Sequence, residues 1–276
     1  MDEQRVAGRG GDRMSDKPVR VYQCEDNISG VLSAVYEAGI SGYGHKYIKI
    51  QPLAANEVYE LELFTEFVRV ESSDEKVNSV LDAVRNKISA RAYSFVMCAA
   101  LSTYPDRGDA IYQFLTYGFS MGEKVCDAMQ IPWVKRAFEI RRRVFNEAHF
   151  FREFIRFREV QREPALLVAT IEPEHHVLPI IMEHFSDRFA GEWFIILDKG
   201  HGEAAFHQKN GDWEVRILTP EEERMLAELG EQREEYVELW KTFFKHIAIP
   251  DRKNEKLQRN MLPLHYRKHL TEFMEE

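Results

Sequence analysis

The stretch NEAHFFREFIRFREV in the middle of the chain concentrates side chains that bind anions. Its mixture of aromatic and basic residues predicts a strand over residues 154–160, with Arg156 and Arg158 on one face. Residues two apart in a strand are separated by about 7 Å, a distance at which two guanidinium groups can hold phosphate. On the preceding predicted helix, His149 and Arg152 also share a face. The stretch therefore predicts a surface for an anionic ligand, although each arginine could instead pair with an acidic neighbour.

A second group of candidates lies in EPEHHVLPIIMEHFSDRF, where a helix is expected. His175 and His176 fall near its start, where the positive end of the helix dipole and two imidazoles could bind an anion. His184 and Arg188 lie four residues apart on one helix face. Ordinary hydrogen-bonded histidines are the alternative interpretation. The segment has no metal-binding histidine spacing, so we predict no metal site here.

Acid–base catalysis is a further possibility. Glu147 or Glu172 could act as a general base with His149 or His184, if burial raises the pKa of the carboxyl group. The sequence contains no phosphate-binding loop, dinucleotide-binding glycine motif or nucleophile elbow. These absences argue against nucleotide hydrolysis by a phosphate-binding loop and against hydrolysis by an elbow serine. Whether the chain is an enzyme stays open.

The charge distribution is uneven. The chain carries a net charge of −9, which argues against a generally basic nucleic-acid binder. However, residues 135–162 contain nine Lys or Arg against four Asp or Glu, and residues 241–268 contain eight against two. The second block alternates aromatic and basic residues, as in proteins that bind single-stranded nucleic acid. Its aromatic residues also have helical spacing, so they could form core instead.

Cofactor and membrane sites are not expected. Cys24, Cys98 and Cys126 are widely spaced, which argues against a disulfide framework or a cysteine metal cluster. No long uncharged apolar run is present, so we expect no membrane association and a cytoplasmic location. We predict no cofactor for this chain.

The order of predicted elements indicates an α+β protein. Residues 1–18 are polar and predict a disordered leader. Residues 19–130 predict an N-terminal α+β lobe, including a helix capped by Asn27 and a helix-rich middle segment. Residues 131–276 predict a C-terminal α+β lobe, with an antiparallel sheet packed against helices and a long helix that starts at Thr219.

The sequences of the two segments quoted above, together with the C-terminal basic block, resemble those of an uncharacterised bacterial family of probable DNA metabolism proteins. The resemblance extends over nearly the whole chain, from about Val19 to Glu272. Phe150 departs from the family pattern, in which an arginine is common, and Arg152 could replace that arginine from another direction. The residues that match the pattern are Glu147, His149, Phe154, Arg156, Phe157, Glu172, Pro173, His184, Phe185, Arg188 and Phe189.

This resemblance implies a role in DNA modification or repair. Relatives are typically paired with a radical S-adenosylmethionine (SAM) iron–sulfur protein, and the domain also occurs fused to a uracil-DNA glycosylase-like domain. The resemblance places the iron–sulfur cluster in that partner, and the lack of a cysteine cluster in this chain is consistent with this arrangement. No catalytic mechanism is implied.

Three functions therefore stay open. The first is an accessory protein that binds DNA or a nucleotide through Arg152, Arg156, Arg158 and Arg188 with the nearby histidines. The second is a nucleic-acid-processing hydrolase that uses the glutamates and histidines named above. The third is a scaffold that only docks a protein partner.

Overall fold

The computed structural model describes residues 17–53, 65–160, 163–230, 246, 261–267 and 269–270. The strands are β1 (Val19–Glu25), β2 (Ile48–Leu53), β3 (Thr65–Arg69), β4 (Arg158–Val160), β5 (Leu166–Ile171), β6 (Trp193–Asp198), β7 (Glu203–His207) and β8 (Trp213–Ile217). The α-helices are α1 (Ile28–Ile40), α2 (Asp74–Lys87), α3 (Ala90–Leu101), α4 (Arg107–Met121), α5 (Pro132–Phe154), α6 (Leu178–Arg188) and α7 (Pro220–Gly230). Short 3-10 helices are η1 (His45–Tyr47), η2 (Gly122–Asp127) and η4 (Leu264–Arg267).

A small parallel sheet begins the chain, with strand order β2-β1-β3. Its central strand β1 is buried over residues 21–24, as expected for a strand with a neighbour on each side. The chain then enters α1, which packs against β1 and β2 and provides the crossover that parallel strands require. The Asn27 side chain accepts a hydrogen bond of 2.7 Å from the Gly30 N–H, so the predicted N-cap is confirmed.

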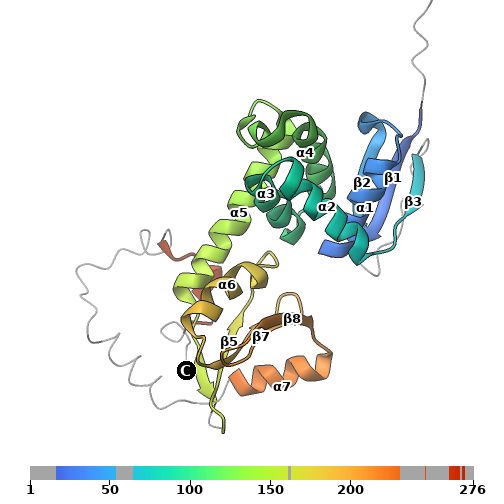
Figure 1. Ribbon diagram of the computed structural model, residues 1–276. Helices are drawn as coiled ribbons and strands as arrows, with labels where there is room; N and C mark the ends of the chain where they lie inside the picture. The colour runs from blue at the N-terminus through green and yellow to red at the C-terminus, as the bar shows by residue number, and fades with distance from the viewer. Residues whose placement is uncertain are drawn as a thin grey trace, which may run out of the picture.

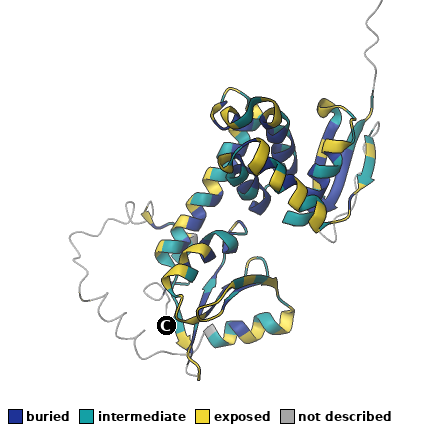
Figure 2. Cartoon of the chain, in the orientation of Figure 1, coloured by how far each residue is buried: buried dark blue, intermediate teal, exposed yellow. Residues whose placement is uncertain are grey.

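Helices α1 to α4 and the first half of α5 form a helical layer around one large core (Figures 1 and 2). Helix α4 comes very close to β2 because Gly108 has no side chain: a Cβ atom there would lie 2.5 Å from Ile50. The Asp109 carboxylate accepts a hydrogen bond of 2.7 Å from the Ile50 N–H and fastens α4 to the strand. We call β1 through the first half of α5 the N-terminal lobe.

The C-terminal lobe contains a five-stranded sheet of order β4-β5-β6-β7-β8. Strands β5 and β6 are parallel and joined by α6, whereas the other three pairings are antiparallel. Helices α6 and α7 cover opposite faces of the sheet, because alternate residues of β6 contact different cores. Phe194 and Ile196 pack with α6, while Leu197 packs with Leu226 of α7.

Helix α5 connects the two lobes (Figure 1). Val144 belongs to the N-terminal core, whereas Ala148 and Phe151 belong to the core under α6. The two cores therefore share one continuous helix. The loop after β5 also contacts the N-terminal lobe, since the His176 N–H donates to the Leu101 carbonyl oxygen at 3.0 Å.

The α+β class is confirmed, and the C-terminal sheet is mixed because of the parallel β5–β6 pair. The strand predicted at residues 154–160 is wrong in part: α5 continues through Phe154, and β4 begins only at Arg158. Phe150 and Phe154 stack at 6.2 Å one helical turn apart, which stabilises the last turn as helix. The three cysteines are free and buried. Among the described residues, no helix is long and apolar enough to cross a membrane.

Some predictions fall outside the described residues. These are the leader over residues 1–16, the part of the long C-terminal helix after residue 230, and most of the basic block over residues 241–268.

Candidate functional site

The parallel pairing of β5 and β6 brings the carboxyl ends of two strands together. In sheets with parallel strands, the loops at the carboxyl ends commonly form the ligand site. Here these are the β5–α6 loop (residues 172–177) and the β6–β7 turn (residues 199–202). They place the rings of His176 and His201 with centroids 4.0 Å apart.

Asp198, at the end of β6, is fully buried and holds the turn that follows it. One carboxylate oxygen accepts from the Gly200 N–H at 2.9 Å, and the other lies 2.7 Å from Nδ1 of His201. Burial lowers the pKa of His201, but the hydrogen bond and charge of Asp198, the charge of Glu203 and the backbone of Glu174 together outweigh burial, so the pKa is raised above its ordinary value. His201 therefore forms a hydrogen-bonded pair with Asp198, and burial raises the pKa of that carboxyl group as well.

His176 has a different environment. Its Nδ1 lies 3.2 Å from a carboxylate oxygen of Glu203, and the two side chains are 24% and 17% exposed. Within the described part of the chain, no hydrogen bond to Nε2 of His176 is found. A carboxylate that contacts one ring nitrogen orients the imidazole and leaves the other nitrogen for a ligand or a proton.

Glu147 on α5 anchors the loop that carries His176. Its buried carboxylate accepts hydrogen bonds from the N–H groups of Glu174 at 2.6 Å and His175 at 2.9 Å. Burial raises the pKa of Glu147 to about 7, although these two donors favour the charged form. Nδ1 of His175 lies 3.1 Å from the hydroxyl of Thr103, and burial lowers the pKa of this histidine. The loop is thus fixed between α5 and the N-terminal lobe.

We call these residues the histidine–carboxylate cluster: Glu147, His176, Asp198, His201 and Glu203. Its chemistry is that of proton transfer and anion binding, because it combines a carboxylate-oriented, partly exposed imidazole with a second, protonatable one. Within the described residues, no group of three or more His, Cys, Asp or Glu side chains could hold a metal ion.

The contacts of the predicted catalytic residues do not join these residues to one another. Glu147 belongs to the cluster, but it serves as an anchor with both oxygens bonded to the backbone. His149 is exposed and lies 3.2 Å from Glu153 of the same helix. Glu172 lies 3.0 Å from Nε2 of His269, and His184 is exposed on α6. The predicted pairing of Glu147 with His149 or His184 is therefore not supported by these contacts.

The predicted anion-binding arginines also lie on different elements. Arg152 of α5 donates to the Ile180 carbonyl oxygen at 2.7 Å and fastens α6 to α5. Arg156 lies in the turn after α5, where it donates to the Phe154 carbonyl oxygen at 3.2 Å. Arg158 is in edge strand β4, while Arg188 is exposed at the end of α6. The prediction that Arg156 and Arg158 project in parallel from one strand face is wrong, because Arg156 precedes the strand.

The two neighbouring histidines have different positions. His175 is only 1% exposed, so it is inaccessible to a large ligand, whereas His176 is in the cluster. The sequence prediction missed Asp198, His201 and Glu203. Their signal was present in the run LDKGHGE, where an aspartate ends a strand and precedes two glycines that permit a tight turn. This run indicates a site only when the parallel pairing of β5 and β6 places it beside the loop that carries His176.

The fold and cluster define an α+β protein with a mixed-sheet lobe and a polar site at the carboxyl ends of its parallel strand pair. Residues 105–272 match the family model for the domain of unknown function DUF4130, and the chain belongs to this family. The matched region includes every residue of the cluster. No curated protein and no solved structure matches the chain.

Proposed function

We propose that the chain is a DNA metabolism protein that handles a nucleic acid or nucleotide at the histidine–carboxylate cluster. The observation that carries this proposal is His176, which is oriented by Glu203 and has its Nε2 unbonded among the described residues. Such an imidazole can accept or donate a proton at a bound substrate. The link to DNA rests on the family resemblance of the sequence, which implies modification or repair.

Besides its carboxylates, the cluster has two positively charged groups nearby that can contact an anionic substrate: His201, whose ring is hydrogen-bonded to Asp198, and Arg143. The pKa of neighbouring His201 is raised, so it carries positive charge over a wider pH range. Arg143 is exposed on α5, and its positive charge helps to lower the pKa of His175, the residue that precedes His176. A phosphate group could therefore bind beside the imidazole that performs proton transfer.

The resemblance also implies a radical SAM iron–sulfur partner, and we include this partner in the proposal. The three cysteines of the chain are buried and come from β1, α3 and η2. They do not form the local cysteine motif that iron–sulfur proteins use. In this division of labour, the partner supplies the iron–sulfur chemistry and this chain binds and positions the substrate.

Histidine side-chain NMR tests the proposal directly. Protein labelled with ¹⁵N-histidine would be titrated with inorganic phosphate, thymidine monophosphate and a short single-stranded DNA. We expect the ring signals of His176 to shift, and His176→Gln to weaken nucleotide binding at least tenfold. The matched control is His184→Gln, which removes an exposed histidine from α6. Equal binding by both variants and wild type, or no shift at His176, would refute the proposal.

A processing activity has a separate readout. Labelled DNA would be incubated with the full chain and the radical SAM partner, and the products resolved by electrophoresis. Because general acid–base catalysis contributes roughly 10²–10⁴-fold, His176→Gln should slow product formation by about that factor. His184→Gln should stay within about twofold of wild type. An unchanged rate in His176→Gln would remove the catalytic part of the proposal.

Accessory DNA binding is the second candidate, favoured by an exposed basic stripe on α5. Lys135, Arg142 and His149 are spaced seven residues apart and are exposed, with Arg143 beside them. The double variant Lys135→Glu/Arg142→Glu, which leaves Arg143 near His175 unchanged, should weaken binding of single-stranded DNA and reduce its salt dependence. Fluorescence anisotropy at two salt concentrations measures both effects.

The outcome separates the remaining functions. Binding that is lost in the charge-reversal variant but kept in His176→Gln assigns the chain to accessory binding. If no DNA binds and the iron–sulfur protein still co-purifies with both variants, the chain is a docking scaffold.

A further inference from the structure

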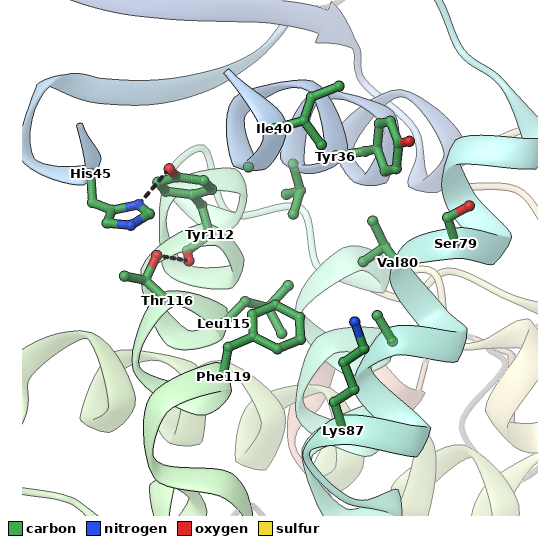
Figure 3. A pocket seen from close by; sticks show the side chains of 13 residues that line it. Tyr36, Ile40, His45, Ser79, Val80, Lys87, Tyr112, Leu115, Thr116 and Phe119 are labelled. Carbon is green, nitrogen blue, oxygen red and sulfur yellow. Dashed lines mark hydrogen bonds between the residues drawn. The ribbon is translucent and has the colours of Figure 1, made fainter. Parts of the chain in front are cut away.

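A groove in the N-terminal lobe, separate from the cluster, has the size and lining of a small-molecule site (Figure 3). It lies between α1, α2 and α4 and has a volume of about 410 Å³. Ligand pockets for small molecules typically have volumes of roughly 300–1,000 Å³. Of its three helices, only α4 falls in the region matched by the family model.

The walls are mainly apolar. Val35 and Ile40 of α1, Val80 of α2, and Leu115 and Phe119 of α4 line the space. Ile40 and Phe119 are 64% and 51% exposed, so both side chains leave apolar surface open to a ligand. These five side chains offer a binding surface for an apolar molecule.

Two small residues keep the groove open. Gly39 and Ala83 line it from α1 and α2. A Cβ atom built on Gly39 would meet nothing within 4 Å, so open space lies beside this position. A larger side chain at either position can therefore be used to fill the groove.

Polar groups lie at the two ends of the groove. At one end, Nδ1 of His45 lies 2.8 Å from the hydroxyl of Tyr112. At the other, the Lys87 side chain extends toward the space beside Phe119 (Figure 3). The lining contains no Asp or Glu, and Lys87 forms no ion pair with any described residue. The charge of the groove thus favours an anionic ligand.

We infer that this groove binds a small amphipathic monocarboxylate with an apolar body, of the class that includes medium-chain fatty acids. The carboxylate pairs with Lys87, while the apolar body packs against Val80, Leu115 and Phe119. A bound protein is disfavoured because stable interfaces bury roughly 800 Å² per partner, and a groove of this volume offers much less surface.

The two parts of the ligand contribute unequally. Lys87 is exposed, and an ion pair between exposed groups contributes little to affinity. Each methylene group of the ligand that leaves water adds to the affinity, so the apolar body should determine most of the affinity. A variant that fills the groove should therefore weaken binding more than loss of the lysine charge.

The test uses the full chain and displacement of the fluorescent probe 8-anilinonaphthalene-1-sulfonate by decanoate. Gly39→Leu and Ala83→Leu fill the groove, and Gly39→Leu also removes a helix-destabilising glycine, so the fold should be retained. Asn86→Leu is the matched control, because Asn86 is exposed on α2 and does not line the groove.

We expect decanoate binding to weaken at least tenfold in both groove-filling variants and to be unchanged in Asn86→Leu. Lys87→Met should weaken decanoate binding roughly threefold without affecting the binding of decanol, which has no carboxylate. Lys124 is an exposed lysine elsewhere in the lobe, and Lys124→Met should change the binding of neither ligand. The inference is overturned if decanoate does not displace the probe, or if the groove-filling variants bind decanoate as tightly as wild type. Self-association of the chain that Gly39→Leu abolishes would assign the groove to a second copy and also overturn it.

Discussion

At the scale of single residues, Glu147 links the titration of one carboxyl group to the geometry of the cluster. Its two oxygens hold the N–H groups of Glu174 and His175 and so determine the position of the adjacent His176. Burial raises its pKa to about 7, the charge of Glu174 adds to the rise, and the charge of His201 opposes it. A raised carboxyl pKa means that the folded state binds this proton more tightly than the unfolded state.

The stability of the wild-type chain should therefore depend on pH. The contribution of Glu147 is fully present below its ordinary pKa of 4.5 and is lost as pH rises through about 7. The shift corresponds to on the order of 3 kcal/mol, at 1.36 kcal/mol per pKa unit. In Glu147→Gln, we expect the fall in unfolding free energy between pH 5 and pH 8 to be smaller, as measured by urea denaturation.

Glu153→Gln is the control, because Glu153 is an exposed glutamate on the same helix. The pKa of His201 is also raised, so this histidine causes a decline in the same direction that persists in both variants. An identical pH profile for wild type and Glu147→Gln would show that the Glu147 carboxyl group is not proton-linked to folding.

At the scale of elements, two packing arrangements position the functional groups. The parallel β5–β6 pair, joined by α6, creates the edge where the cluster lies. In the N-terminal lobe, the contact of α4 with β2 fixes the helix that provides one wall of the groove. This contact depends on Gly108, where a Cβ atom would lie 2.9 Å from Cβ of Ile50 and 3.1 Å from its carbonyl oxygen.

Gly108→Ala should destabilise the chain even though alanine favours helix. The added methyl group overpacks the helix–strand contact, and such overpacking typically costs about 1–3 kcal/mol. Gly39→Ala is the comparison, since its Cβ meets nothing and it should stabilise α1 by up to about 1 kcal/mol. Chemical denaturation gives both values. Equal stabilisation by the two substitutions would contradict the close approach of α4 to β2.

At the scale of the whole molecule, α5 couples two hydrophobic cores. Val144 and Ala148 are one helical turn apart but belong to different cores. Asn146 lies between them and is exposed, so a substitution there can break the helix without removing core packing. The lobes should consequently unfold together in the wild-type chain.

Asn146→Pro should separate the unfolding of the two lobes. A proline inside a helix removes a backbone hydrogen bond and costs about 3 kcal/mol or more. We expect one calorimetric transition in wild type and in Asn146→Ala, and two transitions in Asn146→Pro. One transition in the proline variant would mean that contacts outside α5, such as the loop after β5, are sufficient to couple the lobes.

Local sequence signals predicted several features correctly. Asn27 caps α1, and the side chains of Thr219 and Glu222 reciprocally bond the start of α7, because capping depends on residues three apart. Pro132 begins α5, a position where the fixed backbone angle of proline favours the first helical turn. The error at residues 154–157 has a tertiary cause: Phe151 is buried in the C-terminal core and extends α5 beyond the point where the pattern suggested a strand.

The sequence by itself determined the α+β class, the starts of α1 and α7 and the uneven charge, since these depend on nearby residues. Only the tertiary structure decided which polar residues meet. His176 and His201 are 25 positions apart, and they become neighbours because β5 and β6 pair in parallel and end at the same edge. Strand direction follows from how α6 packs across the sheet, which short-range patterns do not encode.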